Sequence, residues 1–341
     1  MSNLLKAHPD VLSLSEFFTF ITDLGTLIPA AFPHHPITAE QFWDILATPY
    51  KKQSLMQKHE ICMNEVLYRA TSNTLFTLEQ GVPAIMQTTL PHISTEPEAL
   101  FLELKSFVLT LPKNTAVSLY NDIFSWLTKK FEKCIWAERS GGSLRIVHRL
   151  YDSFPDAKFL HIVRDGRTTA LSMQKHYGFR MAMIVFQLTE VLGVDPFEDD
   201  NRNWASDLPD DIACFLPEVF NAQAFRDYTV DSSLFGHYWS GEVIQGLEEF
   251  AKIPQERTLT IKYEDLVARP RHSIQKVDRF IGHSGPNAAQ LADAWINNAI
   301  GMVKKPLSSF DLLSSQERNR LEEACAPGLK ALQDVGIDYA Y

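Results

Sequence analysis

Three short runs of apolar and β-branched residues, each followed by a polar turn, constrain the fold of this chain most strongly. They cover residues 134–137 (CIWA), 158–163 (KFLHIV) and 258–263 (TLTIKY), and each has the length and composition of a buried strand. Helical patterns follow the second and third runs, at residues 168–176 and 270–281. Strands that alternate with helices predict an α/β fold with a parallel sheet.

Composition limits the class of protein. The 341 residues are 45% apolar and 22% charged, and the formal net charge is −10. These values are typical of a folded soluble protein, and they exclude a disordered chain, a collagen-like fibre and a disulfide miniprotein. The negative charge argues against nucleic acid as a partner. We expect one domain over residues 1–341, with the acidic segment 190–225 as a lid or a solvent-exposed insertion.

The cysteines and the apolar stretches indicate the compartment. Four widely spaced cysteines form no CxxC pair, which argues against a zinc site and indicates a reducing environment: Cys62, Cys134, Cys214 and Cys325. The apolar stretch 11–32 contains Glu16 and Asp23, and no basic segment with a following apolar core is present. We therefore expect no membrane span and no secretory signal, and hence a cytoplasmic protein without a metal.

Three further segments have helical periodicity. They cover residues 58–71, 119–131 and 314–334, and the last carries charges of mixed sign at i,i+4 spacing.

Residues 154–176 (FPDAKFLHIVRDGRTTALSMQKH) contain the most informative site pattern. The strand ends at Val163, the turn RDGR follows, and a helix then begins. Ligands of α/β sheets bind beyond the carboxyl ends of strands, and a helix N-terminus there favours an anion. Arg164 and Arg167 add guanidinium groups that match phosphate oxygens, while Ser172 and His176 lie on one helix face. The alternative is an exposed turn without a ligand.

The local charge supports an anion site. Residues 139–180 hold eight Lys or Arg and three Asp or Glu, so this segment carries +5 and the rest of the chain −15. A serine and glycine run just before the segment, Ser140–Ser143, fits either an anion-binding nest or a turn with a serine N-cap. The phosphate loop pattern GxxxxGK[ST] is absent from the chain, which argues against a nucleotide kinase.

Four stretches together resemble the sulfotransferases that use 3′-phosphoadenosine 5′-phosphosulfate (PAPS), most closely the bacterial and tyrosylprotein members. They are HPDV with the following Glu16, WAERSG, FPDAKFLHIVRDGRTTALSM and LTIKYEDLVARP. The resemblance spans residues 1–282. It implies a P-loop NTPase-like three-layer α/β fold with a central parallel sheet, and PAPS as the co-substrate.

The resemblance also implies roles for single residues. Arg164 and Ser172 match the ligands of the donor's 3′-phosphate, and His176 matches a further basic contact. Glu16 matches the catalytic glutamate, the general base on the acceptor hydroxyl; His8 is the rival base, and an ion-paired or helix-capping carboxylate is the alternative for Glu16. Tyr263 and Glu264 open a mostly structural turn. Lys304, with Lys305, resembles a late loop that closes over the nucleotide.

One family element has no counterpart in the sequence. The family's first strand and its loop P-R-S-G-(T/S)-(T/S)-L, which binds the 5′-phosphosulfate, would precede residue 1, so we expect this strand and loop to be missing. Weak binding of 3′-phosphoadenosine 5′-phosphate is the expected consequence. Replacement of the loop by residues 139–143 is an alternative.

These observations leave two functions open. One is a sulfotransferase that moves a sulfuryl group from PAPS to a small-molecule or peptidyl hydroxyl by in-line transfer. The other is a catalytically inactive homologue that acts as a binding or scaffold protein. Aromatic residues near the proposed site are candidates for an acceptor pocket, with burial in the core as the alternative: Phe17, Phe18, Phe20, Trp43, Tyr177 and Phe179.

Overall fold

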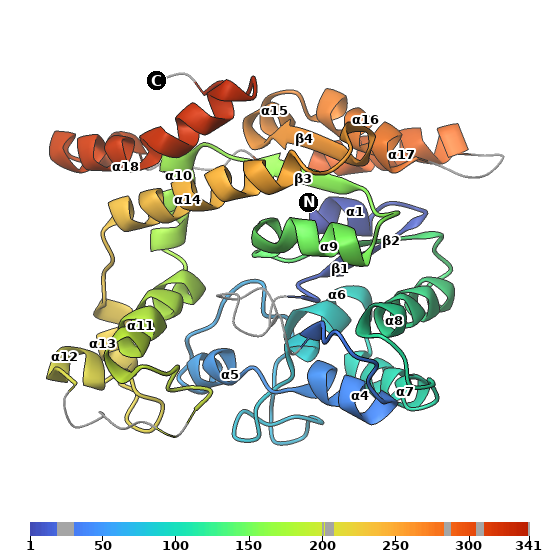
Figure 1. The fold of residues 1–341 in the computed structure, drawn as a ribbon, viewed down its shortest axis with the longest axis horizontal. Coiled ribbons are helices and arrows are strands. Elements are labelled where there is room, and N and C mark those ends of the chain that lie inside the picture. The colour runs from blue at the N-terminus through green and yellow to red at the C-terminus, as the bar shows by residue number, and fades with distance from the viewer. Residues whose placement is uncertain (19–30, 200, 202–207, 283–287, 305–309, 340–341) are drawn as a thin grey trace.

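The computed structural model describes residues 1–18, 31–199, 201, 208–282, 288–304 and 310–339. Helices surround short strands (Figure 1); η marks a short 3₁₀ or π segment. In chain order the elements are α1 (Ser2–Lys6), β1 (Val11–Ser15), α4 (Ala39–Ala47), α5 (Lys51–Lys58), η2 (Ile85–Thr89), α6 (Leu90–Ile93), α7 (Pro97–Val108), α8 (Ala116–Lys130), β2 (Ile135–Arg139), η3 (Ser143–Ile146), α9 (Val147–Ser153), β3 (Phe159–Val163), α10 (Gly166–Gln174), α11 (Tyr177–Leu192), α12 (Asp210–Ala213), α13 (Ala222–Asp227), α14 (Ser232–Phe250), η5 (Gln255–Arg257), β4 (Thr258–Lys262), α15 (Tyr263–Ala268), α16 (Pro270–Ile281), α17 (Ala288–Met302), η6 (Phe310–Leu312) and α18 (Ser315–Asp334).

The four strands of the described residues all pair in parallel, which confirms the α/β prediction. β1 pairs with β2 from Val11↔Ile135 to Ser15↔Arg139, and β3 pairs with β4 from Phe159↔Thr258 to Val163↔Lys262. The three strands expected from the sequence are present as β2, β3 and β4. Residues 11–15, read from the sequence only as part of an apolar stretch, form a strand whose five residues are all buried.

The two strand pairs contribute to the same two cores. Side chains alternate between the faces of a strand, so Trp136 of β2 and Phe159 of β3 contact the core beside α8 and α9. Ala137 of β2 and Leu160 of β3 contact the core formed with α1, α16 and α17. The strands therefore form one layer between two layers of helices.

The layer is divided in the described part of the chain. Backbone hydrogen bonds join β1 only to β2 and β3 only to β4, so one edge of β2 and one edge of β3 have no described strand beside them. An edge of this kind offers unpaired N–H and C=O groups to a further strand. The expectation of a first strand absent from this layer stays a prediction.

Several aromatic residues assigned to an acceptor pocket belong to the core instead. Phe17, Phe18 and Trp43 are buried in the cluster formed with α7 and α8, where Phe17 and Phe18 each pack edge-on against Tyr120. Of the other candidates, two are only partly buried and Phe20 lies outside the described residues. Three of the six candidates therefore do not line a pocket.

The expected helix at residues 58–71 is wrong. α5 ends at Lys58, and Glu60 has a φ of +60° that turns the chain back on itself. The turn places Ile61 in the core beside Met56, and the N–H groups of Leu67 and Tyr68 then bind the Gln87 carbonyl. Packing of Ile61 and bonding to a distant carbonyl outweigh the local helical pattern.

The other two helical expectations are confirmed. Residues 119–130 lie in α8, which ends one residue before the expected Phe131, and residues 315–334 form α18 behind its Ser314 cap. The Ser314 hydroxyl and the Glu317 carboxylate form a reciprocal capping box.

The acidic segment 190–225 has a buried side. Phe197, Phe215 and Phe220 pack in one core with residues of α5 and α11, and Lys52 forms an ion pair with Asp195 at 2.7 Å. The role of segment 190–225 as a lid stays a prediction.

In the described part of the chain, no helix combines the length and the apolar composition that crossing a membrane requires.

Trp239 of α14 holds the helices around the carboxyl end of β3 together. Its indole lies between Gly166 of α10 and Gly328 of α18: a Cβ on Gly166 would lie 2.3 Å from Cε3, and one on Gly328 would lie 2.6 Å from Cζ3. Both helices approach α14 this closely because glycine has no side chain.

Replacement of Gly166 tests this packing. Gly166→Ala should lower the free energy of unfolding by about 1–3 kcal/mol, because the new methyl group overlaps the indole. Gly241→Ala is the matched control, since Gly241 lies on α14 with open space around its Cβ position. The control should be neutral or stabilise by up to about 1 kcal/mol. Urea unfolding measures both, and equal stabilities would contradict the contact.

Candidate active site

The turn between β3 and α10 holds Arg164, Asp165 and Arg167. Asp165 is the N-cap of α10, and its carboxylate accepts hydrogen bonds from the N–H groups of Arg167 and Thr168. The same carboxylate pairs with the Arg167 guanidinium at 2.5 Å. The N-terminal amides of α10 and Arg167 therefore already bind an internal anion, and the donor contact expected of Arg167 stays a prediction.

Arg164 has a different environment. It is half-buried, and its guanidinium lies 5.2 Å from the centre of the Tyr263 ring. In the described part of the chain, no carboxylate forms an ion pair with Arg164. A stacked guanidinium retains its charge and its donors for a bidentate anion.

The YED turn shapes the site although it lies about a hundred residues further along the chain. A Glu264 oxygen accepts a hydrogen bond from the Asp165 N–H at 3.0 Å. Tyr263 and Glu264 thus contact Arg164 and Asp165 from the end of the paired strand β4. The sequence suggested a mostly structural turn, and the structure shows which backbone it holds.

Ser172, His176 and Lys304 occupy separate positions. Ser172 is exposed on α10, and Lys304 is exposed after α17. His176 caps α11, where its Nδ1 accepts the Gly178 N–H, and its Nε2 lies 2.6 Å from a Glu65 oxygen. The phosphate contacts expected of all three residues stay predictions.

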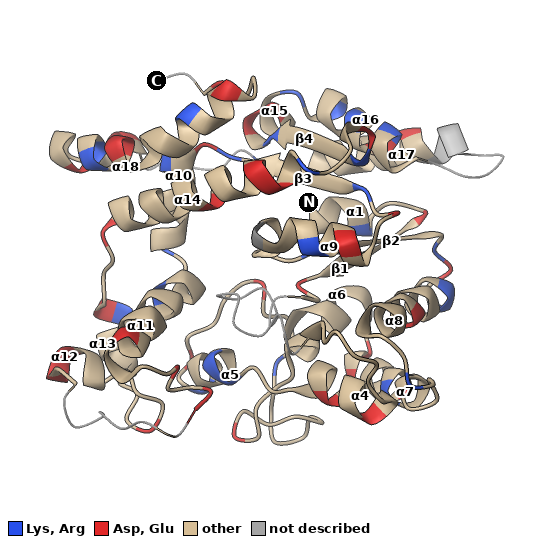
Figure 2. Cartoon of the chain, viewed as in Figure 1, with Lys and Arg blue, Asp and Glu red and all other residues tan. Residues whose placement is uncertain are grey.

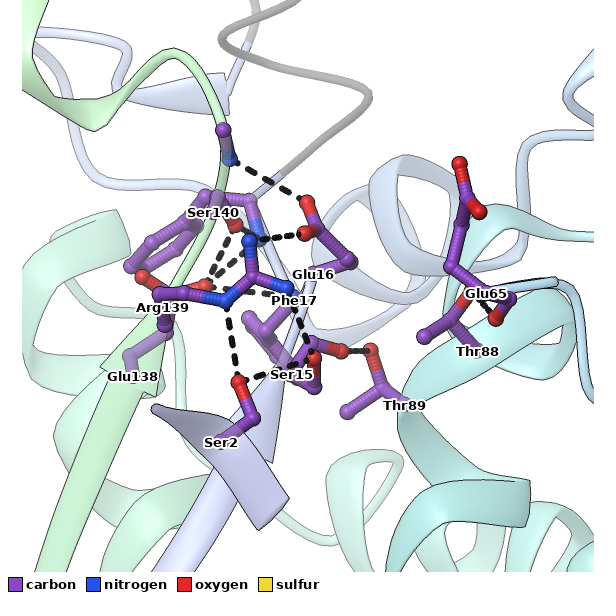
Figure 3. A network of polar contacts seen from close by, with 12 residues as sticks. Ser2, Ser15, Glu16, Phe17, Glu65, Thr88, Thr89, Glu138, Arg139 and Ser140 are labelled. Atoms are coloured by element: carbon purple, nitrogen blue, oxygen red, sulfur yellow. Dashed lines mark hydrogen bonds and ion pairs between the residues drawn. The ribbon is translucent and has the colours of Figure 1, made fainter. Parts of the chain in front are cut away.

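A second polar cluster lies at the carboxyl ends of β1 and β2 (Figure 3). Glu16 follows β1 with a φ of +59°, and its carboxylate pairs with the Arg139 guanidinium at 2.7 Å. Arg139 also binds the hydroxyl groups of Ser2 and Ser15. The ion-paired alternative for Glu16 describes this contact, and its role as a base stays a prediction.

The serine and glycine turn does bind an anion, but an internal one. The Gly141 N–H donates to Glu16 at 3.2 Å. Ser140 accepts the Phe18 N–H and donates to Glu138. The turn therefore fixes the backbone after β1, which leaves replacement of a 5′-phosphosulfate loop without support from its geometry.

Glu138 is the most perturbed carboxyl group of this cluster. One of its oxygens accepts the N–H groups of Phe17 and Phe18 at 3.1 and 3.3 Å. Burial raises the pKa of Glu138 to about 7, and the nearby charge of Glu16 adds to the shift although the Ser140 hydroxyl opposes it.

Two threonines of η2 contact the backbone next to Glu16 and the backbone of Glu65, the partner of His176. The Thr89 hydroxyl donates to the Ser15 carbonyl, next to Glu16, at 2.8 Å, and the Thr88 hydroxyl donates to the Glu65 carbonyl at 2.9 Å. Figure 3 shows Glu65 and both threonines beside the Glu16 cluster. The backbone of η2 thus lies between the end of β1, where Glu16 follows, and Glu65, the partner of His176.

The connecting residues escaped sequence reasoning. Glu65 lies in the segment that was wrongly predicted as a helix, and Thr88 and Thr89 form part of a buried π-helical turn without a recognisable motif. Only Arg139 carried a signal, its place in WAERSG.

His8 does not take part in this network as a base. Its ring is fully buried, packs edge-on against Trp295 at 4.6 Å, and lies 3.8 Å from Asp278. Its Nδ1 accepts the Asp10 N–H. His8 is therefore packed within the fold.

The basic residues of segment 139–180 come from several elements, among them β2, α9, α10 and α11; Figure 2 shows the Lys and Arg residues of the described chain distributed over many helices and loops. Arg149, Lys158 and Arg180 each donate to backbone carbonyls, while Arg139 and Arg167 pair with carboxylates. Most of the local positive charge is thus used within the fold.

Comparison with known proteins identifies the family. The family model described as the sulfotransferase domain matches residues 141–316, just over half of the chain, including the β3 turn, α10 and the YED turn. The chain belongs to the sulfotransferase family. Glu16 and Arg139 lie outside the matched range.

Two individual proteins resemble this sulfotransferase family member. One is described as flavonol sulfotransferase-like, from Flaveria bidentis, with 32% identity over 114 residues. The match covers 31% of this chain and about a third, 34%, of that protein. The other is the solved sulfotransferase domain from the curacin biosynthetic pathway, with 13% identity, 95% and 93% coverage of the two chains, and a TM-score of 0.37. In the described residues, no group of three or more His, Cys, Asp or Glu side chains is placed to hold a metal ion.

The raised pKa of Glu138 makes the stability of this sulfotransferase family member depend on pH. An unfolded glutamate titrates near pH 4.5 and the folded Glu138 near pH 7, so the folded state binds more protons between these values. The stabilising contribution of Glu138 to the free energy of unfolding is therefore complete below pH 4.5. It is lost as the pH rises to about 7.

Glu138→Gln should remove this loss, because the amide oxygen accepts the same N–H groups and carries no charge. The variant should gain stability relative to wild type by about 1–3 kcal/mol as the pH rises from 4.5 to 7.5. Urea unfolding at several pH values measures the difference. Parallel stability curves over this range would show that Glu138 does not titrate as proposed.

Proposed function

We propose that this protein is a sulfotransferase that moves a sulfuryl group from PAPS to a hydroxyl acceptor by in-line transfer. The observation that carries the proposal is the half-buried Arg164 at the carboxyl end of β3, stacked on Tyr263 and without a carboxylate partner among the described residues. Membership of the sulfotransferase family supports the reaction class.

The donor side uses residues around α10. Arg164 binds the 3′-phosphate of the donor through its guanidinium fork, and the exposed Ser172 hydroxyl donates to the same group. His176 and Lys304 supply further basic contacts. Arg167 supports this phosphate site indirectly, because its ion pair with Asp165 keeps the turn in place.

The acceptor side uses the cluster at β1 and β2. The bond between sulfur and the donor's 5′-phosphate oxygen breaks while sulfur bonds to the acceptor oxygen, and Glu16 takes the acceptor's proton. Arg139 orients the Glu16 carboxylate through their ion pair, and we assign its remaining donors to the charge that develops on the transferred group. The side chain of Glu16 keeps 15% of its surface exposed, which leaves room for an acceptor.

A catalytically inactive homologue that binds a nucleotide is the second candidate. One observation favours it: the Gly141 N–H and Arg139 already bind Glu16. Binding without turnover would support this candidate. The proposal further includes a cytoplasmic location and a lid formed by residues 190–225.

The first test concerns the donor site. Arg164→Ala should weaken binding of 3′-phosphoadenosine 5′-phosphate by about 1.5–3 kcal/mol, the worth of a charge-assisted contact. Calorimetry measures both affinities. Arg257→Ala is the matched control, because Arg257 precedes β4 and contacts Asp156 at the opposite end of the strand pair. Equal affinities of Arg164→Ala and wild type would remove Arg164 from the site.

The second test concerns the base. Glu16→Gln should lower turnover with PAPS and a panel of alcohol and phenol acceptors by about 10²–10⁴-fold and leave donor affinity unchanged. Glu60→Gln is the control, since Glu60 is an exposed glutamate that also has a positive φ. Turnover at the wild-type rate in Glu16→Gln would assign the proton transfer to another residue.

A further inference from the structure

The C-terminal residues Val335–Tyr339, here called the strap, fold back onto the ends of β3 and β4. α18 ends at Asp334, and Gly336 has a φ of +81°, a conformation that glycine adopts without strain. The Ile337 N–H then donates to the Leu332 carbonyl. This turn directs the chain from α18 towards the turn that carries Arg164.

The strap contacts both strand ends. The Tyr339 hydroxyl donates to the Val163 carbonyl at 3.1 Å. Lys262 donates to the Asp338 carbonyl, and its ammonium group lies 4.3 Å from the centre of the Tyr339 ring. Val163 and Lys262 are register partners at the end of the parallel pair, so the strap joins the last residues of both strands.

With these contacts, the residues on both sides of Arg164 are held by hydrogen bonds. Val163, before it, is held by Tyr339, and Asp165, after it, is held by Glu264. Burial and the Glu264 carboxylate raise the pKa of Tyr339, so its hydroxyl remains a donor over the physiological range. A carbonyl at a strand end that is held in this way limits the rotation of the peptide that begins Arg164.

We propose that Tyr339 is a positioning residue for the donor site: its hydrogen bond to Val163 sets the backbone from which Arg164 reaches the 3′-phosphate. This inference rests on the proposed function, since it assigns Arg164 to that phosphate. The C-terminal residues belong to neither the YED nor the RDGR pattern. The tertiary structure alone places the strap beside Arg164.

The test removes one hydroxyl. Tyr339→Phe keeps the ring that packs on Lys262 and deletes the hydrogen bond to Val163. It should weaken binding of 3′-phosphoadenosine 5′-phosphate about 3- to 10-fold and leave binding of adenosine 5′-phosphate, which lacks the 3′-phosphate, unchanged. A purely structural role would alter both affinities together.

Tyr228→Phe is the matched control. Tyr228 donates to Gln187 of α11 at 2.8 Å, a neutral tyrosyl hydrogen bond whose acceptor lies on α11 rather than on β3, so its loss should leave both affinities at wild-type values. In the background of Arg164→Ala, the effect of Tyr339→Phe should disappear, because both changes act on one phosphate contact.

The outcomes separate the two proposals. Suppose that wild type binds 3′-phosphoadenosine 5′-phosphate more tightly than adenosine 5′-phosphate, and that Tyr339→Phe shows the same preference. This result would overturn the role of the strap and leave the donor site intact. Wild type that binds both nucleotides equally would overturn the donor site and the phosphate role of Tyr339 with it. Faster amide exchange at residues 164–167 in Tyr339→Phe than in Tyr228→Phe should accompany the loss of affinity, and equal exchange would contradict the positioning.

Discussion

The parallel pairing of β3 with β4 is the constraint on which the rest of the donor site depends. It places Val163 beside Lys262, so the turns that follow the two strands begin at the same edge. Glu264 can then reach the Asp165 N–H, and Tyr263 can lie under Arg164. A shift of one residue in register would point each of these side chains to the other face of the layer, and the turn would lose its supports.

Internal ion pairs decide how much positive charge the site offers to a ligand. Arg167 and Arg139 resemble ligand-binding arginines in the sequence, yet each binds a carboxylate of its own chain. Such pairs hold a turn in one conformation at the cost of donors that a phosphate would use. Arg164, stacked on an aromatic ring, retains more of its donors, which makes it the centre of the proposed donor site.

The π-helical turn η2 carries no motif, yet it contacts two of the polar groups described above. The Thr89 hydroxyl donates to the Ser15 carbonyl at the end of β1, and the Thr88 hydroxyl donates to the backbone carbonyl of Glu65, whose carboxylate contacts His176. The backbone of η2 therefore lies between the Glu16 cluster and the start of α11. The two strand pairs, which are not joined to each other by backbone hydrogen bonds in the described residues, share the helical cores on both faces of the layer.

Local patterns in the sequence determined the strands at 134–137, 158–163 and 258–263, the helices around them and the turn RDGR, because apolar period and turn chemistry act over a few residues. They determined neither the partners of Arg139 and Arg167 nor the strand at 11–15, and they misassigned residues 58–71. Those outcomes depend on contacts between residues far apart in the chain, such as Glu16 with Arg139 or Tyr339 with Val163. Only the tertiary structure decides which oxygen accepts the hydrogen bond of a given donor. Each such pair competes with water and with other residues that are distant in the chain for the same hydrogen bond.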